Sequence, residues 1–295
     1  MCNNTIIVRH GPVLAGERGS SLVTRSVSTW SLHRTLGQFV APGSVAPAGR
    51  LRPSPARSGA LSLLDLPAEL HQRGYVSVQI RHCDLASREP DYLAHVRTSI
   101  EDAGIVLDTM LIEDGDLTHP DLADASETWI GEWLDVATEL GAKRARICAG
   151  RSAPTAALVK KTAERMTRLA RNHPGVRLVT ENWLEMTPDA DTVQRILAET
   201  GDTVGLMIDL GNWSGVTKYE ELAAIAPLAE TCHAKAHMID GVLDRDDFRA
   251  SLQVLKDASY DGPLALIYDG PDPDEWTWLD REWEIVAEVF GESRC

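Results

Sequence analysis

Short apolar runs alternate with longer helical segments along this chain, from about residue 61 almost to its end. This alternation restricts the fold more than any other feature, because strands separated by helices pair in parallel and are buried on both faces. One further strand is expected earlier in the chain. The predicted strands are mostly built of Val, Ile, Leu and Ala and cover residues 26–30, 76–80, 106–110, 144–148, 176–181, 204–209, 231–235 and 264–268.

The segments that follow these strands have helical patterns. They cover residues 64–73, 91–103, 121–140, 154–172, 188–200, 219–226, 245–257 and 279–290. Eight β/α units are the number that closes a barrel. An open doubly wound sheet usually has fewer strands and often a glycine-rich phosphate turn, and neither G-x-G-x-x-G nor G-x-x-x-x-G-K-[ST] occurs here. The sequence therefore predicts an α/β protein with a single (β/α)₈ TIM barrel.

A chain of 295 residues can hold two average domains or one large barrel. We assign residues 26–295 to one barrel and residues 1–25 to a poorly ordered N-terminal extension, and we expect a loop at residues 42–57. Residues 1–60 hold seven Arg and only one acidic residue, Glu17. Such a start is also typical of an organelle transit peptide, which remains the alternative to a simple extension.

The charge of the chain argues against a nucleic-acid partner. The formal net charge is −15, from 29 basic and 44 acidic residues, whereas phosphate backbones attract basic surfaces. No apolar run reaches the ~18 residues of a membrane span. The five cysteines are scattered without a C-x-x-C pair, as expected for a cytoplasmic protein. Asp272, Asp274 and Glu275 are expected to form an exposed acidic loop.

Polar side chains stand near the ends of three neighbouring predicted strands. Glu181 ends residues 176–181, Asp209 ends residues 204–209, and His233 lies within residues 231–235. Active sites of such barrels form at the carboxyl ends of the strands. Each residue alone could be a helix cap or a hydrogen-bonded core residue. Burying all three without compensation would be costly, so a divalent metal is the better explanation, with Mg²⁺, Mn²⁺, Co²⁺ or Zn²⁺ suiting these donors.

Several short motifs occur in a fixed order over residues 26–290. They are TWSLH at 29–33, ENW at 181–183, DLGN at 209–212, HAK at 233–235 and SYDGPL at 259–264. Together they resemble the xylose-isomerase-like family of metal-dependent sugar isomerases and epimerases. The resemblance implies that Glu181, Asp209 and His233 bind a divalent metal together with a Glu of the last strand. It also implies that the two Glu act as acid and base, and that Lys235 holds a substrate oxygen or phosphate.

The chain departs from this family at the last strand, where Ile267 stands at the position of the Glu. Asp269 lies two residues on and points to the same side of a strand. Either Asp269 substitutes by reaching inward or the site has three protein ligands. Glu181 is the expected base, and its catalytic partner is Asp269, His237 or Lys235.

Other polar and aromatic residues near strand ends are candidates for substrate binding. An arginine can clamp a carboxylate or phosphate, and indole rings can wall a sugar pocket. The plain alternatives are a solvated loop residue or ordinary core packing. The candidates are His82, Glu113, Arg151, Trp183, Asn212 and Trp213.

Three functions remain open. The first is an isomerase or epimerase for a small sugar or sugar phosphate, because a metal can stabilise the enediolate formed when a proton leaves the carbon beside a carbonyl. The second is a metal-dependent lyase or dehydratase on the same barrel. The third is a non-catalytic metabolite-binding barrel. The chain could also form a homo-oligomer. The region of Trp276, Trp278 and Trp283 could then serve as a packing surface.

Overall fold

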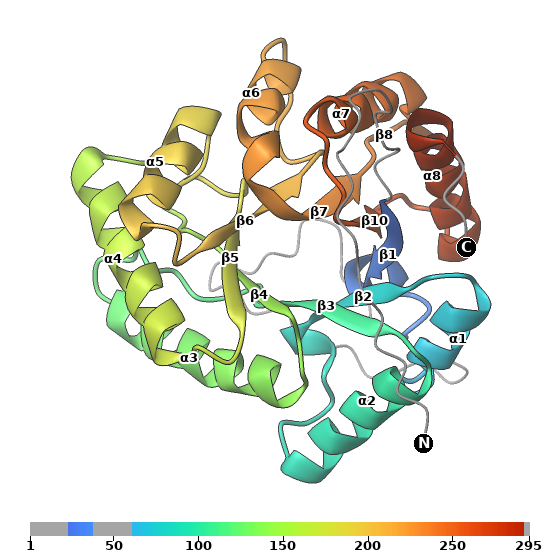
Figure 1. Ribbon diagram of the computed structural model, residues 1–295, viewed down its shortest axis with the longest axis horizontal. Helices are drawn as coiled ribbons and strands as arrows, with labels where there is room; N and C mark the ends of the chain where they lie inside the picture. The colour runs from blue at the N-terminus through green and yellow to red at the C-terminus, as the bar shows by residue number, and fades with distance from the viewer. Residues whose placement is uncertain (1–22, 38–60, 292–295) are drawn as a thin grey trace, which may run out of the picture.

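Parallel strands close into a barrel in the order β1-β10-β7-β6-β5-β4-β3-β2, and helices surround it (Figure 1). The computed structural model describes residues 23–37 and 61–291. The predicted single TIM barrel is confirmed. The barrel strands are β1 (Thr24–Ser28), β2 (Ser77–Arg81), β3 (Val106–Leu111), β4 (Arg144–Ile147), β5 (Arg177–Glu181), β6 (Gly205–Asp209), β7 (Ala229–Lys235) and β10 (Pro263–Ile267).

Each predicted helix is present, with ends that differ by a few residues from the expected ones. The helices are α1 (Leu66–Gln72), α2 (Pro90–Asp102), α3 (Ala123–Glu139), α4 (Ala156–Asn172), α5 (Ala190–Thr200), α6 (Lys218–Ile225), α7 (Arg245–Asp257) and α8 (Glu275–Phe290). Four of them begin after a side chain that accepts a backbone N–H of the first turn, which stabilises a helix start. These caps are Thr155, Asp189, Asp244 and Asp274.

Several short features were not predicted, among them the 3₁₀ helices η2 (His82–Asp84) and η3 (Ala226–Leu228). Residues 29–30, expected in the first strand, belong to the 3₁₀ helix η1 (Thr29–Leu32). A hairpin of β8 (Met238–Ile239) and β9 (Val242–Leu243) lies between β7 and α7. The loop expected at residues 42–57, and residues 1–22 of the expected extension, lie outside the described residues. Among the described helices, none is both long and apolar enough to cross a membrane.

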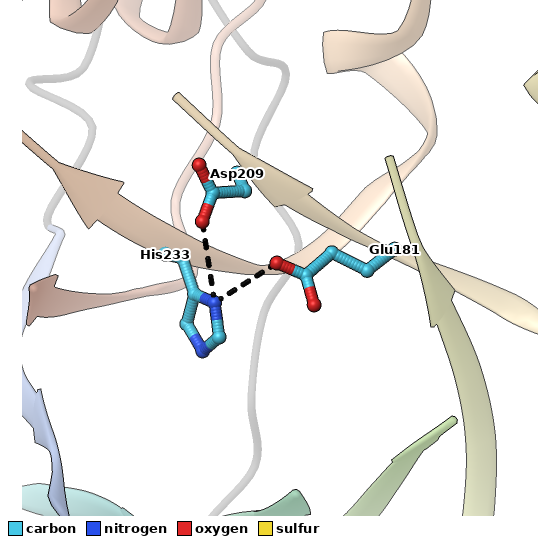
Figure 2. A group of neighbouring side chains, drawn as sticks. All are labelled: Glu181, Asp209 and His233. Carbon is cyan, nitrogen blue, oxygen red and sulfur yellow. Dashed lines mark hydrogen bonds and ion pairs between the residues drawn. The ribbon is translucent and has the colours of Figure 1, made fainter. Parts of the chain in front are cut away.

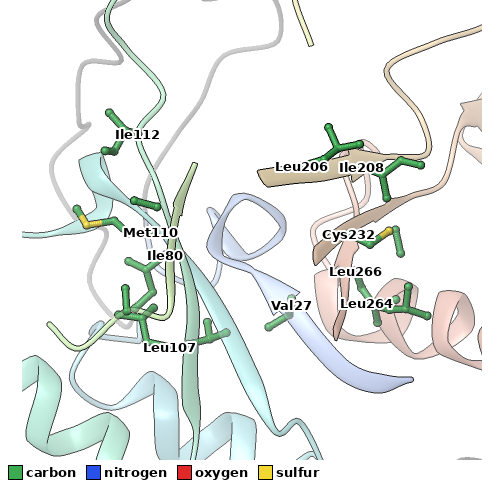
Figure 3. Packing of buried hydrophobic residues seen from close by; sticks show 14 of the residues in the cluster. Val27, Ile80, Leu107, Met110, Ile112, Leu206, Ile208, Cys232, Leu264 and Leu266 are labelled. Carbon is green, nitrogen blue, oxygen red and sulfur yellow. The ribbon is translucent and has the colours of Figure 1, made fainter. Parts of the chain in front are cut away.

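The apolar core has two parts because strand residues alternate between two faces. Leu206 and Ile208 of β6 belong to the main core shared with the helices, part of which is drawn in Figure 3. The residue between them, Met207, instead packs with Leu111 and Val179 in a small separate cluster. Side chains of this second face line the inside of the barrel, so the polar residues at the strand ends on this face meet at its mouth.

The amino ends of the strands carry a polar network centred on Asp108. The register of β2 with β3 shifts at Asp108, and that of β6 with β7 shifts at Glu230, so each acid is the extra residue of a bulge. Arg144 at the start of β4 lies 2.6 Å from Asp108 and 3.6 Å from Glu230. Gln79 and Thr231 also donate to Asp108. This network joins strands from opposite sides of the barrel.

The expected acidic loop after β10 is only partly exposed. Asp272 and Asp274 are exposed, as predicted. The prediction is wrong for Glu275, whose side chain is 0% exposed as the first residue of α8. Its carboxylate accepts the backbone N–H groups of Arg34 and Thr35 at 2.9 Å each. Glu275 therefore ties the segment after β1 to the start of the last helix, a long-range contact that local sequence does not reveal.

Candidate metal centre

Glu181, Asp209 and His233 lie together at the mouth of the barrel (Figure 2). They come from the adjacent strands β5, β6 and β7, and Asp209 is the register partner of His233. His233 Nδ1 lies 3.1 Å from Glu181 Oε1 and 3.5 Å from Asp209 Oδ2. All three side chains are buried. The structure therefore brings together the three residues predicted as metal ligands.

Each carboxylate of this cluster uses its other oxygen elsewhere. Asp209 Oδ1 accepts the backbone N–H of Gly211 at 2.6 Å. Glu181 Oε2 lies 3.0 Å from Nε of Arg146 in an ion pair. One oxygen of each carboxylate is thus left beside His233 Nδ1, and these donor atoms all lie within 4.8 Å of one another. A cation can be shared by three donors that converge in this way.

The amide of Asn182 fixes the spacing of the two acidic strand ends. Its Oδ1 accepts the backbone N–H of Asp209 at 2.7 Å, and its Nδ2 donates to the carbonyl oxygen of Asp209 at 3.0 Å. This pair of bonds resembles one more step of the β5–β6 ladder after β5 has ended at Glu181. The backbone of Asp209 is therefore held relative to that of Glu181.

The charges within the cluster shift the pKa values of its members. Burial alone would lower the pKa of His233, but the carboxylates of Glu181 and Asp209 outweigh it and raise the pKa to about 9. Burial alone would raise the pKa of Asp209, but its bond with His233 and the charge of Lys235 lower the pKa below its usual range. The imidazole acts as the counter-charge of two buried acids, which a divalent cation would replace.

These residues fit a divalent cation. Two carboxylate oxygens and one imidazole nitrogen form a donor set suited to Mn²⁺, Co²⁺, Zn²⁺ or Mg²⁺. Three protein donors leave further positions for water or substrate, as in catalytic rather than structural metal sites. The far ring nitrogen of His233, Nε2, is buried and makes no hydrogen bond within residues 23–37 and 61–291.

Ile267 occupies the position on β10 that faces the cluster. Ala265 and Ile267 are register partners of His233 and Lys235, and partners in parallel strands point to the same side. Ile267 is 4% exposed, so its side chain fills this part of the wall. Asp269 lies beyond the strand, where its Oδ2 pairs with Lys235 Nζ at 3.1 Å. In this arrangement the partner of Asp269 is Lys235, not the cluster.

Lys235 and His237 differ in their contacts at the mouth of the barrel. The charges of Asp209 and Asp269 raise the pKa of Lys235, although burial alone would lower it. The stem of Lys235 crosses Gly211 so closely that a Cβ added there would lie 2.7 Å from Lys235 Cγ. His237 bonds the carbonyl of Gly211 through Nε2 at 2.8 Å, and its Nδ1 lies 3.4 Å from Asp247. His237 is thus engaged by the surrounding loop and helix α7.

The predicted substrate-binding residues after β5 and β6 lie around the cluster. Asn212 donates from Nδ2 to Glu181 Oε1 at 3.1 Å. The guanidinium of Arg146 lies over the ring of Trp183 at 5.1 Å. Trp213 donates its ring N–H to the carbonyl of Thr187 at 3.0 Å, which fixes one loop against the next. Asn212 therefore contacts the cluster directly, Trp183 contacts Arg146 beside it, and Trp213 joins the two loops.

His82 and Glu113 are buried on the β2 and β3 side of the mouth. His82 Nδ1 accepts the backbone N–H of Glu113 at 3.2 Å. The imidazole lies edge-on to the rings of Trp129 and Trp133, and burial lowers its pKa. This environment favours a neutral imidazole, so the alternative of a solvent-facing loop residue is wrong for His82.

Arg151 lies in the loop after β4 and is half-buried. Its backbone N–H is held by Asp116 Oδ1 at 3.2 Å and by Thr118 Oγ1 at 3.1 Å. Thr118 also accepts the backbone N–H of Ser152 at 3.1 Å. The loop is therefore fixed by its backbone, which leaves the guanidinium of Arg151 as a candidate for contact with a ligand.

Sequence reasoning missed Arg146. Its side chain is 2% exposed, and its Nη2 donates to Glu113 Oε1 at 2.6 Å. That bond and the contact with Glu181 place Arg146 between two acids. Although burial alone would raise the pKa of Glu113, Arg146 lowers it below its usual range. The available signal was the alternation in Arg144-Ala145-Arg146-Ile147, which puts two arginines on one face of a buried strand.

Comparison with known proteins supports the fold. No curated protein matches the chain in sequence. A xylose isomerase-like TIM barrel protein from Mycobacterium smegmatis, solved in complex with magnesium, is similar with a TM-score of 0.65 at 15% identity, covering 93% of this chain and 100% of that one. The probable 3-DHS dehydratase AsbF from Bacillus anthracis is similar with a TM-score of 0.64 at 11% identity, covering 90% and 99%.

A third similar structure is the D-psicose 3-epimerase of Clostridium cellulolyticum with D-tagatose. Its TM-score is 0.61 at 12% identity, and the match covers 92% of this chain and 100% of that one. At such identities the likeness shows a shared fold. The family described as xylose isomerase-like TIM barrel matches residues 67–284, well over half of the chain. The chain therefore belongs to the xylose isomerase-like TIM barrel family.

Proposed function

We propose that this protein is a cytoplasmic, divalent-metal-dependent isomerase or epimerase. Its substrate would be a small sugar, a sugar phosphate or a related polyhydroxy carbonyl compound. The observation that carries the proposal is the buried convergence of Glu181, Asp209 and His233, with the three donor atoms within 4.8 Å of one another. Membership of a family with an epimerase among its structural neighbours supports the substrate class.

The reaction we propose starts with loss of a proton from the carbon beside the substrate carbonyl. A bound divalent cation would supply positive charge to the oxygen that becomes negative in the enediolate. Glu181, at the carboxyl end of β5, is the proposed base. Asn212 and Trp183 would orient the substrate beside Glu181, because Asn212 contacts Glu181 and Trp183 lies over the neighbouring Arg146. Return of the proton to a neighbouring carbon gives the isomer.

Lys235 is the proposed second group for proton transfer. Its ammonium stands at the mouth, paired with Asp269 at 3.1 Å. His237 is less suited because Gly211 and Asp247 engage its two ring nitrogens. Lys235 would donate to the substrate oxygen, and Asp269 would hold the ammonium in place. His82 and Arg151 are proposed to contact the far end of the substrate.

The first test is the metal content of protein purified without added metal or a His tag. We expect about one Mn, Co, Zn, Fe or Mg per chain in the wild type and none in Asp209→Ala. Asp272→Ala, which removes an exposed aspartate, is the control and should keep the metal. Protein that binds no metal even after incubation with Mn²⁺ would contradict the proposal.

The second test is catalytic. Ketohexoses, aldoses and their phosphates are incubated with the Mn²⁺-loaded protein in D₂O, and the products are analysed by NMR. Deuterium at the carbon beside the carbonyl, lost in Glu181→Gln, is the expected result. Exchange that persists in Glu181→Gln would remove Glu181 as the base.

One observation favours a second candidate, a metal-dependent dehydratase or lyase. Ile267 stands where a second acid would face the cluster, so the wall of β10 offers a hydrocarbon side chain there. An elimination needs a base and a leaving group on a substrate but no second carboxylate on the opposite wall. A product lighter by one water, or split into two fragments, distinguishes this reaction by mass spectrometry. Ligand binding without turnover would indicate a metabolite-binding barrel.

A further inference from the structure

Arg146 is a deeply buried cation beside the cluster of Glu181, Asp209 and His233. It lies on β4, with its side chain 2% exposed, between Glu113 at 2.6 Å and Glu181 at 3.0 Å. The face of its guanidinium lies over Trp183, and its Nη1 donates to the carbonyl of Ile112 at 3.4 Å. Backbone, aromatic ring and one acid thus hold Arg146 from three directions, and the remaining Nε faces a predicted metal ligand.

The stability of the fold alone does not explain this arrangement. A buried ion pair contributes little net stability, because the loss of hydration of both charges offsets their attraction. Among the described residues, Arg146 Nε and Glu181 Oε2 form an ion pair but no hydrogen bond of good geometry. A long apolar side chain could fill the same volume. The position of Arg146 therefore points to a role connected with the carboxylate of Glu181.

Each acid of the cluster has a contact on its outer oxygen, a hydrogen bond for Asp209 and an ion pair for Glu181. Gly211 fixes Asp209 through Oδ1, and Oδ2 is left beside His233. Arg146 contacts Glu181 through Oε2, and Oε1 is left beside His233. A glutamate has more rotatable bonds than an aspartate, so it loses more rotamer freedom when it binds a cation. The ion pair with Arg146 restricts this freedom before a cation binds.

We propose that Arg146 is a positioning residue, which contacts the outer oxygen of Glu181 and so keeps the inner oxygen turned toward the cation site. This inference rests on the proposed metal site. Glu113 anchors Arg146, so Glu113, Arg146 and Glu181 form one chain from β3 through β4 to β5. The fork of a guanidinium can contact two acids at once, whereas a lysine ammonium is a single point on a flexible stem. Both the charge and the shape of Arg146 are therefore required.

The test compares two arginines on the same face of β4. Arg146 and Arg144 are two residues apart, and Arg144 pairs with Asp108 at 2.6 Å, away from the cluster. Mn²⁺ is titrated into chelator-treated protein, and free Mn²⁺ is measured by its EPR signal. We expect Arg146→Met and Arg146→Lys to weaken Mn²⁺ binding by about 10–100-fold, as found for residues that orient metal ligands. Arg144→Met and Arg144→Lys should stay within about twofold of the wild type by the same reasoning.

The opposite outcomes overturn the inference. If Arg146 acted only by its charge, Arg146→Met would bind Mn²⁺ more tightly and Arg146→Lys would match the wild type. Equal affinity in all variants would remove any role for Arg146 at the site. Wild-type protein that binds no Mn²⁺ would contradict the proposed function, and this inference with it. Wild-type binding with unchanged Arg146 variants would contradict this inference alone.

A spectroscopic measurement separates positioning from a loss of structure. The visible absorption of bound Co²⁺ depends on the number and geometry of its ligands. We expect the Co²⁺ spectrum to change in Arg146→Lys and to match the wild type in Arg144→Lys. If Arg146→Met does not fold, Glu113→Gln tests the same chain, since it removes the charge that anchors Arg146. A Co²⁺ spectrum identical to the wild type in both Arg146→Lys and Glu113→Gln would overturn the inference.

Discussion

Buried acids have different hydrogen-bond partners at the two ends of the barrel interior. At the amino end of the strands, Asp108 Oδ1 accepts from Arg144 at 2.6 Å. Its Oδ2 accepts from Gln79 at 3.0 Å, from Thr109 at 2.9 Å and from Thr231 at 2.7 Å. Four donors thus surround this one carboxylate. An acid satisfied so completely has no capacity left for a ligand.

At the carboxyl end, two carboxylates share one imidazole. Glu181 and Asp209 both face His233 Nδ1, and Nε2 of the same ring makes no hydrogen bond among the described residues. Both acids therefore converge on a single ring nitrogen, whereas Asp108 alone accepts from four donors. Polar burial at one end thus joins strands of the barrel, while at the other end it brings together three donor groups that fit a cation.

The strongest test of this difference between the two ends is to neutralise one aspartate at each end. Asp209→Asn should weaken Mn²⁺ binding beyond the roughly 100-fold that loss of an orienting residue can cause, because it removes a ligand. Asp108→Asn should leave Mn²⁺ affinity unchanged but lower the free energy of unfolding by about 3 kcal/mol, as expected for a broken buried pair. Mn²⁺ titration and urea unfolding measure the two effects. Similar effects of both variants on Mn²⁺ affinity would show that the ends are not distinct.

A second prediction concerns pH, because the cluster contains a histidine with a raised pKa. The pKa of His233 rises from 6.5 to about 9 on folding. Its stabilising charge is therefore fully present below pH 6.5 and is lost as the pH approaches 9 and passes it. In chelator-treated protein the free energy of unfolding should fall over this window by at most roughly 3 kcal/mol.

Urea unfolding at a series of pH values measures this loss. His233→Gln serves as the control and should remove the slope. Added Mn²⁺ should also reduce it, because the neutral imidazole is the form that binds a metal. A slope that persists in His233→Gln would assign the titration to another group.

A third prediction sharpens the contrast by adding a ligand to the mouth. Ile267→Glu places a carboxylate on the inward side of β10, on the same face as His233. We expect Mn²⁺ binding to strengthen roughly tenfold, or about 1.4 kcal/mol. Without metal the variant should be less stable than the wild type, because the new acid is buried. Ile267→Gln is the control. An equal gain in Mn²⁺ affinity in this variant would exclude an effect of the added charge.

The smallest effect is expected at Glu230, in the second bulge at the amino end. Glu230 is bound by Arg177 through two nitrogens at 2.6 and 3.1 Å, and both side chains are about one third exposed. Glu230→Gln should lower the free energy of unfolding by about 1 kcal/mol or less, because partly exposed pairs contribute little. Mn²⁺ affinity should not change. A large loss of Mn²⁺ binding would mean that the two ends are coupled through the barrel.

The fold could be predicted because its signal is repeated. Strand and helix patterns follow one another eight times, and local errors at the ends of elements do not change that count. The start of α8 was placed late because its first turn contains Glu275, an acid that reads as a loop residue but is buried. The β8–β9 hairpin was missed because strands of two residues carry no periodicity.

The convergence of Glu181, Asp209 and His233 was predicted because strand order alone places these residues side by side. Arg146 could not be assigned in the same way. Its partners, Glu113 and Glu181, lie 33 and 35 positions away in the sequence, and a buried arginine is rare enough to be discounted in a strand. The partners of Lys235, Asp269 and His237 also depend on loop conformation, which the patterns of strands and helices do not contain.

The amide of Asn182 has a consequence for the thermodynamics of any ligand that binds here. It bonds the backbone of Asp209 on both its N–H and its carbonyl, so two strand ends are ordered during folding. Fixing a residue's backbone costs about 1–2 kcal/mol of conformational entropy, and here that cost falls on folding and not on binding. Association at this mouth can therefore proceed with little additional loss of backbone entropy, which leaves more of the contact energy available as affinity.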